Sequence, residues 1–312
     1  KGLLNQIEKH TEGMKVAVHF NRSLDKTQRI YNDLNLSFKI VETLSDFEFS
    51  FQNSVIPITQ NIDILIKSPL VDVVVDMTGS IEFSAKLTLD CIANKKDILS
   101  FNAELDATLG PVLKYKADKA GVKYCVGEGD QPGCTMNLYR FVKQIGLTPL
   151  VCGNIKGMLD EYRTPDTQKE FAKPWNMSPH MVTSFADGTK VNLEQACIAN
   201  ATGMKVAKRG MLGHESKDHI DNLTGIYDID ELKELGGVVD FIVGAKPGPG
   251  VFVYACSDGG DPFVEKYLKY GKLGDGPLYS FYIPYHLLFF EIPISIARMV
   301  DFDDNIIAAK AG

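Results

Sequence analysis

A lysine between glycines, with acidic side chains further along the chain, is the feature of this sequence with the most direct chemistry. Lys156 lies in Cys152–Gly157 (CGNIKG), where small neighbours leave room for its ammonium group to approach a ligand. Such a lysine can polarise a carbonyl or donate a proton during hydride transfer. Asp187, Lys190 and Glu194 fit a proton-relay or substrate-binding cluster. A surface lysine and a salt-bridged helix start explain the same residues almost as well.

Further polar residues of the second half suit a small anionic substrate. Lys205, Lys208 and Arg209 form a short basic run that can clamp a phosphate, and a solvated helix face is the alternative. His286 is a further catalytic candidate as a general acid or base, although a lone histidine is more often structural. The residues that we expect to bind substrate are Asp130, Gln131, His180, Lys208 and Arg209.

The first half offers a nucleotide site. Asn21, Arg22 and Ser23 follow a predicted strand at the place where an NAD-specific fold usually carries an acidic residue. Arg22 can instead bond a 2′-phosphate through its guanidinium group, which favours NADP, and Ser23 also fits a helix N-cap. The other expected cofactor contacts are Gly2, Thr78, Gly79, Asn102 and Glu104. A plain strand-to-helix turn at Thr78 and a first-turn role for Glu104 are equally compatible with the pattern.

The start of the sequence lacks the glycine fingerprint G-x-G-x-x-G of dinucleotide-binding folds. Gly2 fits the last glycine of such a loop, with the helix that follows it. We therefore expect the first strand and most of the loop upstream of Lys1, and a flexible end at Gly2 is the alternative. On this interpretation the working protein is longer than the 312 residues.

Strand and helix signals alternate through the first half, which indicates βαβ units and a parallel sheet. We expect Val55–Thr59 at a sheet edge because Pro57 cannot donate a hydrogen bond. The other predicted strands are Met14–Phe20, Phe38–Val41, Val71–Asp76, Asp97–Phe101 and Val122–Val126, and the predicted helices are Gly2–His10, Lys26–Leu34, Ile81–Asn94 and Leu109–Ala120.

The second half begins after the loop-rich segment Gly127–Gly133. We expect an irregular stretch at Asp160–Met177 and a strand pair, Phe241–Gly244 and Val251–Ala255, joined by a tight loop. Ile283–Met299 looks like a helix that is apolar on all sides and that Pro293 kinks or restarts. The fold class is therefore α/β, with a Rossmann-type domain over residues 1–133 and a mixed α+β substrate domain over residues 134–282. The last segment, residues 283–312, is expected to return to the domain interface.

Composition narrows the class of protein. The chain is 45% hydrophobic and 23% charged, which excludes a disordered chain, a collagen and a long coiled coil. A net charge of −7 argues against a dedicated nucleic-acid binder, and no apolar run approaches the roughly 18 residues that cross a bilayer. Six scattered cysteines and no signal peptide suggest reduced thiols in a cytoplasmic protein. No metal-binding motif is present, so a divalent metal is possible but not indicated.

Two sets of motifs resemble known families. VDVVVDMTG, KKDILSFNAEL and GVKYCVGEG, in this order, are similar to the cofactor domain of homoserine dehydrogenase, although that family's turn lysine falls at Ala103 here. CGNIKG, GDQPG, PHMVTSFADGTK, NATGMKVAKRGM and PGPGVFV resemble homoserine-dehydrogenase-like oxidoreductases, nearest to the enzymes like 1-deoxy-D-xylulose 5-phosphate reductoisomerase.

The resemblance implies an NADP-dependent oxidoreductase that reduces a carbonyl held between its domains. Its nearest branch implies reductive isomerisation of 1-deoxy-D-xylulose 5-phosphate to 2-C-methyl-D-erythritol 4-phosphate, a step of isoprenoid biosynthesis. Two alternatives stay open: a homoserine dehydrogenase that reduces aspartate semialdehyde, and a non-catalytic nucleotide-binding sensor. The expected partners are a phosphorylated or carboxylated small molecule and further copies of the chain in a homo-oligomer, without nucleic acid or membrane.

Overall fold

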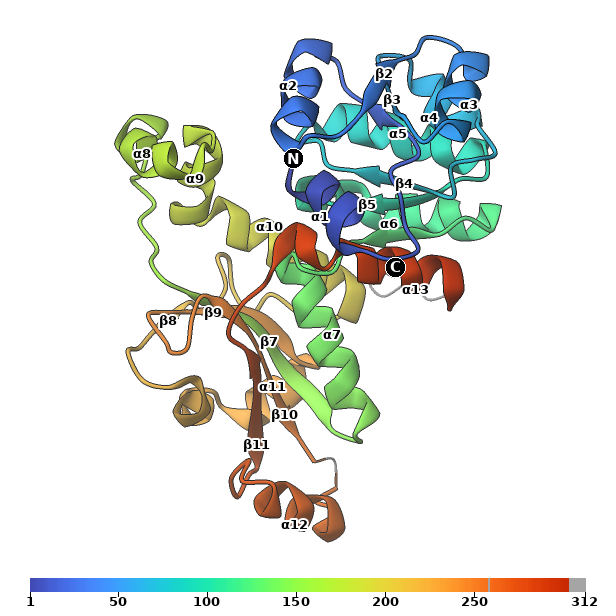
Figure 1. Cartoon of the computed structure of the whole chain (residues 1–312). Coiled ribbons are helices and arrows are strands. Elements are labelled where there is room, and N and C mark those ends of the chain that lie inside the picture. The colour runs from blue at the N-terminus through green and yellow to red at the C-terminus, as the bar shows by residue number, and fades with distance from the viewer. Residues whose placement is uncertain (258, 303–312) are drawn as a thin grey trace. The chain divides into compact units, whose positions relative to one another are not determined.

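The protein is described from a computed structural model, which describes residues 1–257 and 259–302. The chain divides into two compact units (Figure 1). The first unit comprises residues 1–105, 112–129 and the described residues from Leu287 on. The second comprises residues 106–111 and the described part of residues 130–286.

The first unit contains two three-stranded parallel sheets with helices between the strands. Their strand orders are β1-β3-β2 and β4-β5-β6. Buried residues of its strands and helices, such as Val74, Ile98 and Leu87, pack together to form its main hydrophobic core. The elements are α1 (Gly2–His10), β1 (His19–Phe20), α2 (Leu24–Leu34), β2 (Phe38–Ile40), α3 (Leu44–Gln52), β3 (Ile56–Thr59), α4 (Ile62–Lys67), β4 (Val73–Asp76), α5 (Ile81–Ala93), β5 (Asp97–Ser100), α6 (Ala103–Ala120), β6 (Tyr124–Val126), η3 (Leu288–Phe290) and α13 (Ile292–Asp301).

The position of β3 corrects one prediction, because this strand is central and not at an edge. Ile56 N and Ile58 O bond toward β2, so the alternation of a parallel strand turns the nitrogen of Pro57 toward β1. Pairing with β1 begins only at Ile58, opposite His19. The missing N–H therefore falls where no ladder bond is needed. Of the predicted strand Met14–Phe20, only these last two residues, His19 and Phe20, pair with a neighbour.

The second unit is built on a five-stranded mixed sheet in the order β11-β10-β7-β9-β8. Its elements are α7 (Gln131–Gln144), β7 (Thr148–Lys156), α8 (Pro165–Ala172), η1 (Lys173–Trp175), α9 (Pro179–Ala186), α10 (Thr189–Thr202), β8 (His214–Glu215), η2 (Ile220–Ile226), α11 (Ile229–Leu235), β9 (Val238–Val243), β10 (Gly250–Cys256), α12 (Pro262–Tyr270) and β11 (Leu278–Ile283).

The sheet of the second unit is covered on both faces. Every residue of β10 is buried. Phe252 and Tyr254 pack with Ile220 and Leu232 of η2 and α11, so the alternate residues of the strand face the other side, where α7 packs on β7 and β10. The predicted pairing of Phe241–Gly244 with Val251–Ala255 is wrong, because β7 lies between β9 and β10 and pairs with both.

Two further predictions need correction. Asp160–Met177 is not irregular throughout, since Thr164 begins α8 with a capping box to Thr167, a local signal that hydrophobic periodicity does not contain. Ile283–Met299 is not one helix. Its first residue ends β11, and α13 begins only at Ile292, with Pro293 in the first turn, where a missing N–H costs nothing. One face of α13 is buried, whereas Ile294 and Val300 of the same helix are exposed, so the helix is not apolar and buried on all sides.

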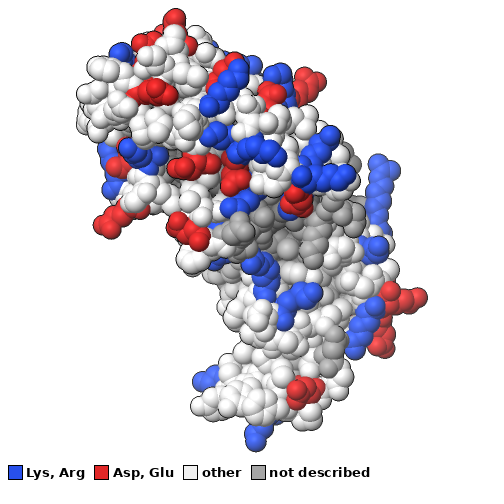
Figure 2. All heavy atoms as spheres, turned by 90° about the vertical axis from the view of Figure 1, so that its right-hand side faces the viewer, with Lys and Arg blue, Asp and Glu red and all other residues white. Residues whose placement is uncertain are grey.

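Two surface properties bear on the class of protein. Within residues 1–257 and 259–302, no helix is long and apolar enough to cross a membrane. On the face seen in Figure 2, lysine and arginine side chains are interspersed with aspartate and glutamate side chains. This face therefore does not present a field of one sign.

Candidate active site

In the first unit, a small polar network holds the turn after β4. Thr78 N donates to Asp76 Oδ1 at 2.9 Å, and the Thr78 hydroxyl lies 2.8 Å from that of Ser84. The Asn102 side chain donates to Thr78 O and to Ser84 Oγ, both at 3.1 Å, and its Oδ1 caps α6 by accepting from Leu105 N. Asn102 thus orders the turn, while Gly79 faces open space and leaves the backbone accessible. Carboxyl ends of parallel strands are where this kind of fold binds nucleotides.

The residues after β1 are arranged to present their side chains. Asn21 Oδ1 accepts from Ser23 N at 2.9 Å, which closes a tight turn. Ser23 occupies the N-cap position of α2, but its hydroxyl does not cap the helix. The Arg22 side chain is exposed and forms no ion pair with any described residue. Both groups therefore remain available to a ligand.

Gly2 and Glu104 lie on first turns of helices. A Cβ at Gly2 would be 2.4 Å from the Phe289 ring, so a larger residue here would require the Phe289 side chain to shift. Glu104 is half-buried in the first turn of α6.

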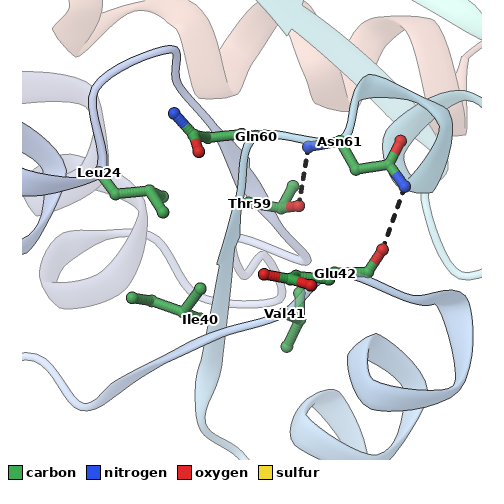
Figure 3. Close-up of a pocket in the computed structure, with 7 residues that line it drawn as sticks. All are labelled: Leu24, Ile40, Val41, Glu42, Thr59, Gln60 and Asn61. Carbon is green, nitrogen blue, oxygen red and sulfur yellow. Dashed lines mark hydrogen bonds between the residues drawn. The ribbon is translucent and has the colours of Figure 1, made fainter.

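A pocket in the first unit is lined by residues that no sequence motif indicates (Figure 3). It has a volume of about 430 Å³ and lies where β2 and β3 end and α2 begins. Its lining residues are Leu24, Ile40, Val41, Glu42, Thr59, Gln60 and Asn61. They carry no sequence motif, because the fold gathers them from three separate segments.

The loop after β6 is held in place by hydrogen bonds and an ion pair to helix α13 and by a backbone hydrogen bond from η3. Glu128 is buried; its backbone N donates to Ser295 Oγ at 2.8 Å, and its carboxylate pairs with Arg298 at 3.1 Å. Leu288 N donates to Gly129 O at 2.7 Å. Residues some 160 positions apart in the chain therefore hold this part of the first unit together.

Lys156 is the last residue of β7, at the carboxyl end of this central strand of the second unit's sheet. β7, β8, β9 and β11 all run in the same direction, because β7 and β11 are each antiparallel to β10 while β8 and β9 are parallel to β7. Gly244 N, just beyond β9, donates to Lys156 O at 2.7 Å, and Lys156 Nζ donates to Phe185 O at 2.7 Å. Burial lowers the pKa of Lys156, and the carboxylates of Glu194 and Asp187 partly oppose this by raising it.

Acidic groups gather beside this lysine. Asp187 ends α9 and accepts from Thr189 N at 2.8 Å. Glu194, on α10, is 6% exposed and lies 3.9 Å from Lys190 Nζ. Burial raises the pKa of the Cys197 thiol, and the carboxylates of Asp106, Asp130 and Glu194 raise it further. The structure therefore brings four predicted residues, Lys156, Asp187, Lys190 and Glu194, into one electrostatic neighbourhood. Asp130 and Glu194 both act on the Cys197 thiol.

A second cavity, of about 440 Å³, adjoins this neighbourhood through Asp187. Gly188 and Asn192 line it on the same side, and Gly210 and Phe241 line it from other segments. Lys208 and Arg209 directly precede Gly210 and are exposed. They lie in a turn and not on a helix face. Asp240 holds this turn, because its Oδ1 accepts from Gly213 N at 2.9 Å.

The remaining predicted residues are placed apart or serve other contacts. His180 is exposed in the first turn of α9 and has no partner among the described residues. His286 follows β11, and its Nδ1 is buried without a hydrogen-bond partner in the described chain. Asp130 caps α7 through Gln131 N at 3.0 Å. Gln131 is fully buried and its Oε1 has no partner among described residues.

Comparison with known families agrees with this arrangement. Residues 1–127 match the model of the homoserine dehydrogenase NAD-binding domain, which indicates that this part of the chain binds a nicotinamide cofactor. Residues 129–292, more than half of the chain, match the model of the catalytic domain of oxidoreductase DRL. The chain belongs to the DRL oxidoreductase family. No curated protein matches the chain by sequence.

A solved homoserine dehydrogenase structure shows a similar fold at low identity, and a reductoisomerase structure also matches part of the chain. A homoserine dehydrogenase from Thiobacillus denitrificans is 15% identical, with a TM-score of 0.50 over 92% of this chain and 67% of its own. A 1-deoxy-D-xylulose 5-phosphate reductoisomerase from Zymomonas mobilis in complex with NADPH is 12% identical, with a TM-score of 0.42 over 63% of this chain and 53% of its own. The chain spans about half the length of several structures that it matches.

Proposed function

We propose that the protein uses NADPH to reduce the carbonyl group of a small anionic substrate, with Lys156 as the proton donor. The observation that carries this proposal is the placement of Lys156 at the end of β7. There it is half-buried, has a lowered pKa and lies beside two carboxylates. A lysine whose pKa is moved toward neutrality is suited to give up a proton during a reaction.

The residues of the first unit fit a nicotinamide dinucleotide. Gly79 leaves open space at the carboxyl end of β4, and the buried Asp76 Oδ2 has no hydrogen-bond partner among the described residues. Thr78 and Gly79 would approach the phosphates through their backbone. Arg22 and Ser23 would hold a 2′-phosphate. When bound, the reduced nicotinamide supplies the hydride that attacks the carbonyl carbon.

The second unit supplies the proton and the charge balance. Lys156 would donate a proton from Nζ to the carbonyl oxygen as negative charge develops there. Glu194 and Asp187 keep the lysine charged before the reaction, because their carboxylates raise its pKa against the effect of burial. Lys208 and Arg209 would hold an anionic group of the substrate beside the cavity that Gly210 lines.

For the substrate, the motifs of the second half make 1-deoxy-D-xylulose 5-phosphate the first compound to test. Among the described residues, no group of three histidine, cysteine, aspartate or glutamate side chains is placed to hold a metal ion. Aspartate semialdehyde is the second compound. Ala103 stands where homoserine dehydrogenases have a turn lysine, which counts against it.

The experiment measures NADPH and NADH binding and then NADPH oxidation with sugar phosphates and semialdehydes. Lys156→Met should lower kcat by about 10²- to 10⁴-fold without changing NADPH affinity, and Lys156→Arg should restore little of it. Lys173→Met is the matched control, since Lys173 is an exposed lysine that pairs with Glu170.

Each outcome bears on a different part of the proposal. Unchanged turnover in Lys156→Met refutes the role of the lysine. A clear preference for NADH refutes the role of Arg22. Tight NADPH binding with no turnover on any compound supports a nucleotide-binding sensor instead.

A further inference from the structure

The Lys205–Gly213 turn of the second unit is attached to β9 at both of its ends. At its start, Lys205 pairs with Val238 of β9, and the two backbone hydrogen bonds of this bridge are both 2.9 Å. At its end, Gly213 N donates to Asp240 Oδ1 at 2.9 Å, and β8 then continues beside β9 (Figure 1). The whole turn is therefore held between two nearby positions of one strand.

The backbone of this turn adopts a conformation that needs such support. Gly210, Met211 and Gly213 have φ angles of +81°, +66° and +66°. Met211 carries a Cβ, for which the left-handed conformation is unfavourable. Its side chain is buried and its N–H donates to Lys208 O at 2.9 Å. If one end of the turn were released, its exposed part would be able to leave this conformation.

Asp240 attaches the end of the turn through a buried charge. Its carboxylate is fully buried, and the oxygen that does not bond Gly213 accepts from Tyr227 Oη at 2.7 Å. The rings of His214 and Tyr254 pack edge-on against Tyr227, with centroid distances of 5.1 and 5.7 Å. Burial raises the pKa of Tyr227, and the charge of Asp240 raises it further, so the phenol keeps its proton and donates it. Tyr227 thus fixes Asp240 from within the core, and Asp240 fixes Gly213.

The exposed part of the turn carries two cations whose position decides what they can bind. Lys208 and Arg209 are exposed, and neither forms an ion pair with a described residue. Gly210 follows them and lines the cavity of about 440 Å³. Three carboxylates line the same cavity, namely those of Asp160, Glu161 and Asp187. Because these carboxylates repel an anion, an anionic group is held here only if both cations approach it closely.

We propose that Asp240 and Tyr227 are positioning residues, which hold the Lys205–Gly213 turn so that Lys208 and Arg209 meet the anionic group of the substrate. The inference rests on the proposed role of these two cations. Asp240 and Tyr227 act through the backbone of the turn and do not touch the ligand. A turn that is already ordered contributes to affinity, because binding does not have to order it.

The substitution Asp240→Asn separates positioning from a direct effect of charge. If Asp240 acted on the ligand through its charge, a neutral side chain would strengthen the binding of an anion, because a repelling charge is removed. A positioning role predicts the opposite result. The NH₂ group of asparagine would face one of the two donors, Gly213 N or Tyr227 Oη, so the turn would loosen and the anion would bind more weakly.

The experiment measures the binding of inorganic phosphate by calorimetry and, with NADPH, the KM and kcat for 1-deoxy-D-xylulose 5-phosphate. Asp240→Asn and Tyr227→Phe should each weaken phosphate binding about 5- to 20-fold and raise KM by a similar factor, with kcat within about 2-fold of the wild type. In a protein that already carries Lys208→Gln and Arg209→Gln, neither substitution should have a further effect. Hydrogen exchange at the amides of residues 210–213 should be faster in both variants.

Tyr254→Phe is the matched control, because it removes a buried phenol hydroxyl from the same core whose acceptor, Ile220 O, lies outside the turn. It should leave phosphate binding and KM unchanged. Circular dichroism at the assay temperature identifies the variants that are folded. If Asp240→Asn is not folded, Tyr227→Phe decides the test, since it keeps both the charge and the aromatic ring.

The outcomes distinguish this inference from the proposed function. Phosphate binding that is lost in Lys208→Gln with Arg209→Gln, but is unchanged or tighter in the folded Asp240 and Tyr227 variants, overturns the positioning role alone. Phosphate binding that survives the loss of both cations overturns their proposed role and the inference with it. If the wild-type protein reduces no compound, the proposed reaction fails, and phosphate binding by itself decides the positioning role.

Discussion

Replacing Tyr227 with phenylalanine removes one hydroxyl from a buried carboxylate and leaves the aromatic ring in place. Tyr227 Oη donates to Asp240 Oδ2 at 2.7 Å, and Asp240 is 0% exposed. The other oxygen of Asp240 accepts from Gly213 N at 2.9 Å. In the variant, water cannot reach the carboxylate to replace the lost donor. Asp240 would then keep one neutral donor for a full negative charge.

The size of the effect follows from the charge of the acceptor. A hydrogen bond to a charged, buried group contributes about 1.5–3 kcal/mol, whereas one to a neutral carbonyl contributes about 1 kcal/mol. We therefore expect Tyr227→Phe to lower the free energy of unfolding by about 3 kcal/mol. This corresponds to a fall in Tm of roughly 6–12 °C for a domain of this size. The turn with Lys208 and Arg209 should also loosen, because Asp240 holds it at Gly213.

A matched control lies in the same core. Tyr254 is also buried, and its Oη donates to a neutral acceptor, Ile220 O, at 2.6 Å. Tyr254→Phe should cost about 1 kcal/mol. Urea unfolding of both variants, of Asp240→Asn, and of Tyr227→Phe combined with Asp240→Asn completes a double-mutant cycle with the wild-type protein and gives the coupling free energy. The reasoning is refuted if Tyr227→Phe costs no more than Tyr254→Phe, or if Asp240→Asn recovers none of the loss.

Three further perturbations follow from single contacts. Because the Lys156 ammonium is the proposed acid and burial lowers its pKa, kcat should fall on the alkaline side at a lower pH than for an ordinary lysine. Glu194→Gln removes a carboxylate that raises this pKa, so the alkaline limb should move to lower pH, and a move to higher pH would contradict the assignment. Gly129→Ala places a Cβ 2.1 Å from Leu288 O at a φ of +85°, and should destabilise the first unit by roughly 2–5 kcal/mol in calorimetry. Gly121→Ala, at a φ of +66° with nothing within 4 Å of the Cβ, should cost only about 1–2 kcal/mol, and equal losses would argue against the clash. Burial lowers the pKa of His19 to about 4, so the unfolded chain takes up a proton first as the pH falls. The contribution of His19 to the free energy of unfolding should be fully present above pH 6.5 and fall by up to about 3 kcal/mol toward pH 4. In unfolding experiments at different pH values, His19→Gln should flatten this profile.

Local patterns predicted most elements of the first unit. Val73–Asp76 and Asp97–Ser100 form strands as expected, because a run of β-branched and aliphatic residues between helical segments has few other ways to bury itself. The prediction of an edge strand from Pro57 is wrong for a physical reason. A proline excludes a strand from the sheet interior only where its nitrogen faces a paired neighbour, and that depends on where β1 begins to pair.

The polar sites depended much more on tertiary structure. Lys156, Asp187 and Glu194 were recognisable from residue type and neighbouring glycines, and the fold brings them together. Glu42 and Gln60, or Tyr227 and Asp240, belong to no motif, because each pair joins segments that meet only in the folded chain. Glu128 with Ser295 and Arg298 is the extreme case, since no local signal relates residues 167 and 170 positions apart.

The sequence by itself determined the fold class, the family resemblance and the kind of chemistry, because hydrophobic periodicity and short glycine-flanked motifs act within a few residues of one another. Tertiary structure alone decided which strands became neighbours, as at β7 between β9 and β10. It also decided which carboxylate faces which cation or cavity. Hydrogen bonds and Coulomb interactions act over a few ångströms in space whatever the separation along the chain, so the partners of Glu128 and Asp240 were defined only once the chain had folded.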